Sequence, residues 1–125
     1  MTATERAIEL VTTAAQAASD KLASNLLAFD VSEQLVITDA FLLCSAPNER
    51  QVKSIVDEVE DKLRDIGAKP IRREGERDGR WVLSDYADIV VHVQHEEERQ
   101  FYALERLWRD CPTIPLPADV TAERG

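Results

Sequence analysis

The spacing of apolar residues predicts a helix near the start of the chain. Residues 8, 11, 15, 18 and 22 are apolar and recur at intervals of three and four, which places them on one helical face. Thr2 and Glu5 resemble a capping box that would begin this helix. Because the apolar stripe is narrow and partly alanine, we expect it to cover the core of its own domain. It is also a candidate surface for self-association.

Two apolar runs follow and predict strands. The first covers residues 26–31, and the second, over 35–44, is continuous enough to indicate an inner strand. Pro47 ends the second run, and Asn48 is placed to cap another helix. The apolar face of that helix recurs from residue 52 to residue 66, and Gly67 is expected to end it.

The second half of the chain predicts a hairpin, a further strand and a last helix. Residues 70–74 and 81–83 would pair around the Asp78-Gly79 turn. Residues 85–88 then interrupt the apolar pattern before it resumes at 89–93, which leaves either one bent strand or two short ones. The last helix is predicted over 96–109, with acids at its start and arginines at its end. Its apolar residues are expected to face the core: Phe101, Leu104, Leu107 and Trp108.

Strands and helices are interspersed, which predicts an α/β (α+β) fold with a mixed sheet of about five strands packed with helices. A chain of 125 residues fits a single domain. Prolines at 112, 115 and 117 exclude further helix. We therefore divide the chain into a domain over residues 1–111 and a Pro-rich flexible C-terminal tail over residues 112–125.

The net charge and the two cysteines limit the classes of function that this chain can have. The chain has 15 basic and 24 acidic residues, a net charge of -9, so a phosphate backbone would be repelled and direct DNA binding is not expected. An acidic surface favours a basic protein as partner. There is neither a signal peptide nor a membrane-length apolar run, which predicts a cytoplasmic protein with no membrane contact. Cys44 and Cys111 lack metal-site or redox spacing, and we expect no metal and no cofactor.

The order of residues around the predicted hairpin resembles the signature of the Iojap or ribosomal silencing factor family. The matching residues are Glu74-Gly75, the run 79–93, Arg99, Phe101-Tyr102, Leu104-Glu105 and Leu107-Trp108, with upstream echoes at 30–32, 38–41 and 50–52. Together they span residues 5 to 110. Three departures stand out: Ala87 replaces a usual glycine, Gln94 replaces a common phenylalanine, and residues 45–48 replace a T-G-x-S type turn. Alanine tolerates fewer backbone conformations than glycine, so the local geometry at residue 87 is the point most affected.

The resemblance implies a nucleotidyltransferase-like topology and a function without catalysis. A protein of this family would bind ribosomal protein fourteen of the large subunit, block joining of the small subunit sterically, and repress translation when nutrients are short. The family is also linked to late assembly of the large subunit, so a role in ribosome biogenesis is the alternative. Some members form homodimers, which makes a homodimer possible here.

Six residues are candidates for partner binding: Trp81, Asp85, Tyr86, Asp88, His92 and Tyr102. Trp81 is either an interface anchor or a core residue. Tyr86 is expected at the interface, where a phenol gives apolar contact and a hydrogen bond together. Asp85 and Asp88 would pair with basic side chains or else cap the turn. His92 would be a hydrogen-bonded sheet residue if it does not contact the partner, and Tyr102 belongs either to the core or to a surface patch.

A metal-dependent nucleotidyltransferase is the remaining hypothesis, with Asp39, Asp85 and Asp88 holding magnesium. Such an enzyme needs a Gly-Ser turn for the triphosphate followed by paired carboxylates. The corresponding segment here is Ser45-Ala46-Pro47-Asn48 followed by Glu49. There is also no phosphate-loop pattern and no nucleophile with an adjacent base. We therefore expect no enzymatic activity.

Overall fold

A computed structural model describes residues 2–121 and begins with helix α1 (Glu5–Asp20). The predicted capping box is wrong, because the side chain of Thr4 accepts the hydrogen bond from the Ala7 N–H and caps the helix in place of Thr2. Val11, Ala15 and Ala18 are buried as predicted, but the two ends of the predicted stripe are not. Ile8 and Leu22 are exposed, and Leu22 lies beyond the end of the helix with a positive φ. The buried residues are mainly alanines, with Leu10 and Val11.

Five strands form one mixed sheet in the order β1-β2-β5-β4-β3. Strand β2 (Ala40–Ala46) is fully buried, which confirms the predicted inner strand, and it pairs antiparallel with β1 (Ser24–Asp30) and parallel with β5 (Ile89–His95). The predicted start of β2 at residue 35 is wrong. Residues 35–39 belong to a loop closed by the bond from the Val31 N–H to the Asp39 carbonyl.

The hairpin between β3 (Arg72–Glu74) and β4 (Trp81–Asp85) is present as predicted. The interruption after β4 is a second tight turn, so the region forms two strands, and β4 pairs antiparallel with β5. In this turn the Tyr86 N–H donates to the Ile89 carbonyl, and Ala87 has a φ of 71°. This is the left-handed conformation for which glycine is the usual residue.

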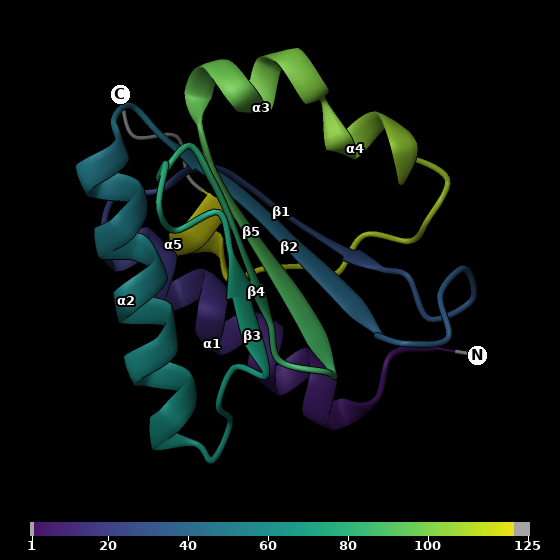
Figure 1. Cartoon of the computed structure of the whole chain (residues 1–125). Coiled ribbons are helices and arrows are strands. Elements are labelled where there is room, and N and C mark those ends of the chain that lie inside the picture. The colour runs from purple at the N-terminus through teal and green to yellow at the C-terminus, as the bar shows by residue number, and fades with distance from the viewer. Residues whose placement is uncertain (1, 122–125) are drawn as a thin grey trace.

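One face of the sheet is covered by α1 and by α2 (Glu49–Asp65), which Asn48 caps as predicted. Figure 1 shows α1, α2 and the short α5 (Ala118–Thr121) on that side, and the last helical segment on the other. Alternate residues of the strands meet α1 and α2 in the main core. This layered single domain confirms the predicted fold class.

The last helical segment is broken into α3 (Glu96–Tyr102) and α4 (Leu104–Leu107). Ala103 separates them with a φ of 46°, so the continuous helix predicted over 96–109 is wrong. The break turns Phe101 and Leu107 toward solvent, with 81% and 71% of their surface exposed. Leu104 and Trp108 do pack inward, as expected.

Residues 112–121 are held against the sheet by backbone bonds and apolar contacts. The Asp30 N–H donates to the Pro112 carbonyl and the Ile114 N–H donates to the Ala28 carbonyl, both at 2.8 Å, so this segment lines the outer edge of β1. Ile114 and Val120 are buried. The segment is therefore extended but not loose up to Pro117, where α5 follows, so the expectation that the prolines exclude further helix is wrong. Residues 122–125 of the predicted tail lie outside the described residues. The domain boundary at residue 111 stays a prediction.

Candidate docking face of the sheet

The face of the sheet opposite α1 and α2 is only partly covered, and it holds most of the predicted site. We call it the second face. Its apolar cluster draws on three strands and the segment after α4: Phe29, Val31, Phe41, Leu43, Val90 and Cys111, with Leu35, Leu83, Leu104 and Trp108 packed against them. The α3–α4 segment covers this face along one side (Figure 1). Strand β5 leads directly into α3, where the His95 side chain caps the helix by accepting from the Glu97 N–H.

Six aromatic rings form a continuous row across the second face, which we call the aromatic row. In order they are Trp108, Phe41, His92, Trp81, Tyr102 and Phe101, and successive ring centroids are 5.2, 5.2, 6.1, 4.9 and 5.0 Å apart. Such separations are those of favourable edge-to-face and tilted ring contacts. The row therefore joins β2, β5 and β4 to the α3–α4 segment as one packed unit.

Trp81, His92 and Tyr102 are three of the six predicted residues, and the row brings them together. The indole N–H of Trp81 donates to Nδ1 of His92 at 3.1 Å. Burial lowers the pKa of His92 to about 4, so the ring is neutral near pH 7. Trp81 is half-buried, Tyr102 is about half exposed and Phe101 is largely exposed, so this end of the row is open to a partner.

Asp85 and Asp88 lie at the other end of β4 and β5, in the turn between them. The Asp85 carboxylate accepts a hydrogen bond from the Ala87 N–H at 2.8 Å and lies 3.5 Å from the Arg72 guanidinium. It therefore stabilises the turn, which is the alternative that the sequence left open. Asp88 has an exposed side chain. Its backbone carbonyl accepts from the Asp39 N–H and joins this turn to the start of β2.

Tyr86 was expected on the surface, and the structure places it in the main core with 5% of its surface exposed. It follows Asp85, the last residue of β4, at a position whose side chain points to the α1–α2 side. Among the described residues its hydroxyl has no hydrogen-bond partner. Burial raises the pKa of Tyr86 to about 12, with a further contribution from the nearby Glu60 carboxylate. Its phenol is therefore not available for contact with a partner.

An ion pair that the sequence reasoning missed braces the break between α3 and α4. Nε of Arg99 donates to both carboxylate oxygens of Glu105, at 3.1 and 3.0 Å, and the Arg99 side chain is only 8% exposed. On a continuous helix, residues six apart do not share a face, so periodicity alone could not join these two. The available signal was the resemblance itself, because both residues belong to the matching R-x-F-Y-x-L-E pattern.

The structure gives no metal-binding arrangement to the three aspartates of the enzyme hypothesis. Among residues 2–121, no group of three or more His, Cys, Asp or Glu side chains is placed to hold a metal ion. Asp39 accepts the Thr4 N–H, and Asp85 is bonded within its turn. In the same range no helix is long and apolar enough to cross a membrane.

Comparison with protein families and named proteins gives consistent matches. The family model described as ribosomal silencing factor during starvation matches residues 4–125. Ribosomal silencing factor RsfS of Halalkalibacterium halodurans is 41% identical over 108 residues, which are 86% of this chain and 92% of the relative. The Bacillus subtilis protein of the same name is also 41% identical, over 82% of this chain and 87% of its own. The chloroplastic protein Iojap of maize is 32% identical, over 84% of this chain and 46% of its own.

Two crystal structures share the fold. A protein from Bacillus halodurans superposes with a TM-score of 0.76 at 39% identity, over 86% of this chain and 98% of its own. A protein from Chromobacterium violaceum superposes with a TM-score of 0.78 at 30% identity, over 88% of this chain and 92% of its own. The likeness therefore extends over most of the fold.

Proposed function

Because the chain belongs to the ribosomal silencing factor family, we propose that it binds the large ribosomal subunit through ribosomal protein fourteen and prevents the small subunit from joining. The mechanism is steric, so it requires a docking surface and no catalytic group. The protein works in the cytoplasm, where ribosomes assemble and translate, and it represses translation when nutrients are short.

The observation that carries the proposal is the accessible end of the aromatic row. Trp81 and Tyr102 contact each other at 4.9 Å and remain partly open to solvent on a face that α1 and α2 leave uncovered. Large aromatic rings held rigidly at a surface are the side chains that contribute most to protein interfaces. His92 fixes the Trp81 ring from beneath through its hydrogen bond, so the anchor is ordered before the partner arrives.

Charge supports a basic ribosomal protein as the partner. The chain carries a net charge of -9, and the exposed Asp88 lies at the end of β4 and β5 away from α3. Long-range attraction between an acidic and a basic protein speeds their encounter and selects their orientation. We therefore assign anchoring to Trp81 and Tyr102, and orientation to Asp88. Asp85 and His92 act on the site indirectly, by fixing the turn and the indole.

The test is sedimentation of purified large and small subunits with and without the protein. We expect the protein to travel with large subunits and to reduce the yield of joined ribosomes. Trp81→Ala should weaken binding at least about tenfold, and Asp88→Lys should weaken it by repulsion. Tyr86→Phe is the matched control, because it changes an aromatic residue outside the docking face.

Other outcomes would redirect the proposal. Binding that leaves subunit joining unchanged would reject steric silencing and favour a role in assembly of the large subunit. Full binding by a correctly folded Trp81→Ala variant, checked by circular dichroism, would show that the aromatic row is not the docking surface. If the parent protein did not travel with large subunits, the proposed function itself would be wrong.

A further inference from the structure

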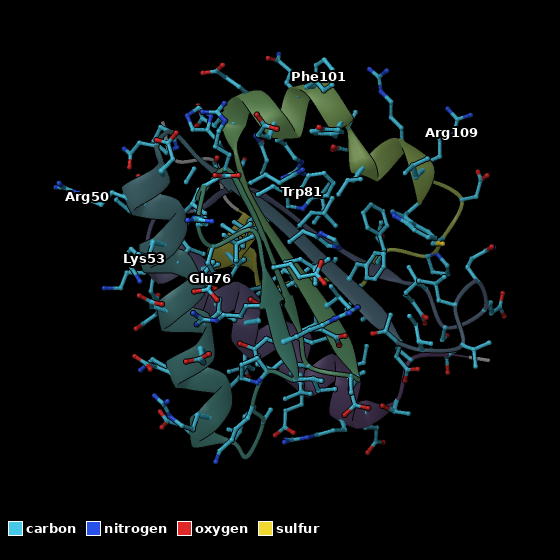
Figure 2. The ribbon with its side chains drawn as sticks, in the orientation of Figure 1. Arg50, Lys53, Glu76, Trp81, Phe101 and Arg109 are labelled. Atoms are coloured by element: carbon cyan, nitrogen blue, oxygen red, sulfur yellow. The ribbon has the colours of Figure 1, made fainter. Side chains whose placement is uncertain are left out.

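The outward side of the α3–α4 segment exposes two apolar and two cationic side chains. These are Phe101, Arg106, Leu107 and Arg109, which we call the outer edge. Figure 2 shows Phe101 and Arg109 on the side of this segment away from the sheet, with Trp81 between the segment and the strands. The left-handed Ala103 and the Arg99–Glu105 ion pair fix this arrangement.

The two arginines of the outer edge differ from most others in the chain in having no carboxylate partner. Other arginines form ion pairs with nearby acids: Arg6, Arg64, Arg72, Arg73, Arg80 and Arg99. Among residues 2–121, the guanidinium groups of Arg106 and Arg109 make no ion pair and no hydrogen bond. Glu105, the acid beside Arg106, is already bound to Arg99. The outer edge thus presents two unpaired guanidinium groups on an acidic protein, with Asp110 as the exposed acid that follows Arg109.

A basic protein does not fit this site, because like charges facing each other across an interface cost free energy. Phosphate does fit, since the planar guanidinium fork matches phosphate oxygens. The exposed ring of Phe101, on the same segment as these cations, adds a stacking platform for an unpaired base. Arg50 on α2 is also exposed and cationic, but the groove that it lines contains three carboxylates and no aromatic ring, so it lacks this second feature.

From these observations we infer that the outer edge contacts RNA of the large subunit, with Phe101 stacked on an unpaired base and Arg106 and Arg109 bound to phosphates. The inference rests on the proposed function, because it needs the protein to be on the large subunit. The aromatic row connects the proposed protein contact at Trp81 and Tyr102 with the proposed RNA contact at Phe101. Phe101 is 5.0 Å from Tyr102, which in turn contacts Trp81, so the site bridges the border between a ribosomal protein and the RNA beside it.

The test is the salt dependence of binding to purified large subunits, measured for the parent and for Arg106→Gln/Arg109→Gln. Each lost phosphate contact reduces the slope of log affinity against log salt concentration by about 0.7–0.9. We therefore expect the slope to fall by about 1–2 and affinity at low salt to fall as well. Arg50→Gln/Lys53→Gln removes the same charge from α2, on the left in Figure 2, and should leave the slope unchanged. Phe101→Ala should weaken binding without altering the slope.

The sign of the effect separates RNA from protein as the partner. If the outer edge faced a basic protein, removing two positive charges would strengthen binding, and that result would overturn the inference. If the double variant gave the same salt slope as the parent, the RNA contact would be rejected too. The proposed docking would still stand in that case, provided that the parent protein binds large subunits. Ultraviolet crosslinking provides the direct readout. A nucleotide attached to the peptide containing Phe101 is expected, and attachment only to ribosomal protein would reject the RNA contact.

Discussion

The indole N–H of Trp81 points at Nδ1 of His92, and the two atoms are 3.1 Å apart. The residues lie diagonally across neighbouring antiparallel strands, because the residue directly opposite His92 is Leu83. Diagonal positions on one face of a sheet are within reach of long aromatic side chains. The bond requires a neutral imidazole whose proton is on the other nitrogen, Nε2. The protonation state of a buried histidine is thereby coupled to the orientation of the proposed anchor.

Acid should destabilise the protein through His92. The pKa of this group is about 4 in the folded protein against 6.5 when unperturbed. Between these values the unfolded chain binds more protons, so the free energy of unfolding should decrease as pH falls from 6.5 to 4, by on the order of 3 kcal/mol from this group. Urea denaturation of the parent and His92→Gln at pH 7.5 and pH 4.5 measures this. The parent should lose more stability than the variant, and equal losses would contradict the prediction.

Ala87→Gly should stabilise the protein. The left-handed conformation costs an alanine about 1–2 kcal/mol, and the extra flexibility of glycine in the unfolded chain offsets about 0.5–1 kcal/mol of the gain. We expect a higher urea midpoint with an unchanged slope, which corresponds to about 0.5–1 kcal/mol. Ala68→Gly is the control. Ala68 is outside the left-handed region, so this substitution should lower the free energy of unfolding. A lower midpoint for Ala87→Gly would show that the turn is not strained.

Glu105→Gln should lower the free energy of unfolding by about 2 kcal/mol, because it leaves the Arg99 guanidinium buried with no opposite charge. Urea denaturation again provides the measurement. Glu9→Gln, which removes the exposed Arg6–Glu9 pair, should change stability by less than about 0.5 kcal/mol. Arg99→Met/Glu105→Leu should recover part of the loss. If Glu105→Gln and Glu9→Gln changed the free energy of unfolding by similar amounts, the Arg99–Glu105 pair would have to be solvated.

Tyr86→Phe should leave the protein equally stable or raise its free energy of unfolding by up to about 1 kcal/mol, because a buried hydroxyl without a partner is removed. Tyr86→Ala should instead cost about 3–5 kcal/mol through the cavity it creates. Thermal unfolding of both variants measures the difference. A large loss for Tyr86→Phe would reveal a hydrogen bond to ordered water at the hydroxyl.

Periodicity predicted the elements well where one residue pattern dominated. The continuous apolar run around Leu42 identified an inner strand, and Asn48 marked the start of α2. It did not predict the break at Ala103, because Ala103, Leu104 and Glu105 are good helix formers and a single left-handed residue leaves no periodic trace. It also extended β2 back to Leu35. Val36 and Ile37 favour strands by type, but the loop closed by Val31 and Asp39 leaves both exposed.

The candidate site was predicted in part for a similar reason. The sequence identified Trp81 and His92 as candidates on two strands, but alternation within each strand could not show that they share a face or that their side chains meet. Tyr86 was misplaced because the turn begins one residue later than the apolar pattern indicated, which keeps its side chain in phase with the buried side of β4. Arg99 and Glu105 were missed because their contact depends on the broken helix.

Both tryptophans of the chain, Trp81 and Trp108, are members of the aromatic row, and the α1–α2 side of the sheet has none. The intrinsic fluorescence of the protein therefore originates from one face of one sheet. A partner that settles on Trp81 would shift this emission without any attached dye, and a ligand of the α1–α2 side would leave it unchanged. The protein thus carries its own optical reporter at the surface where docking is proposed.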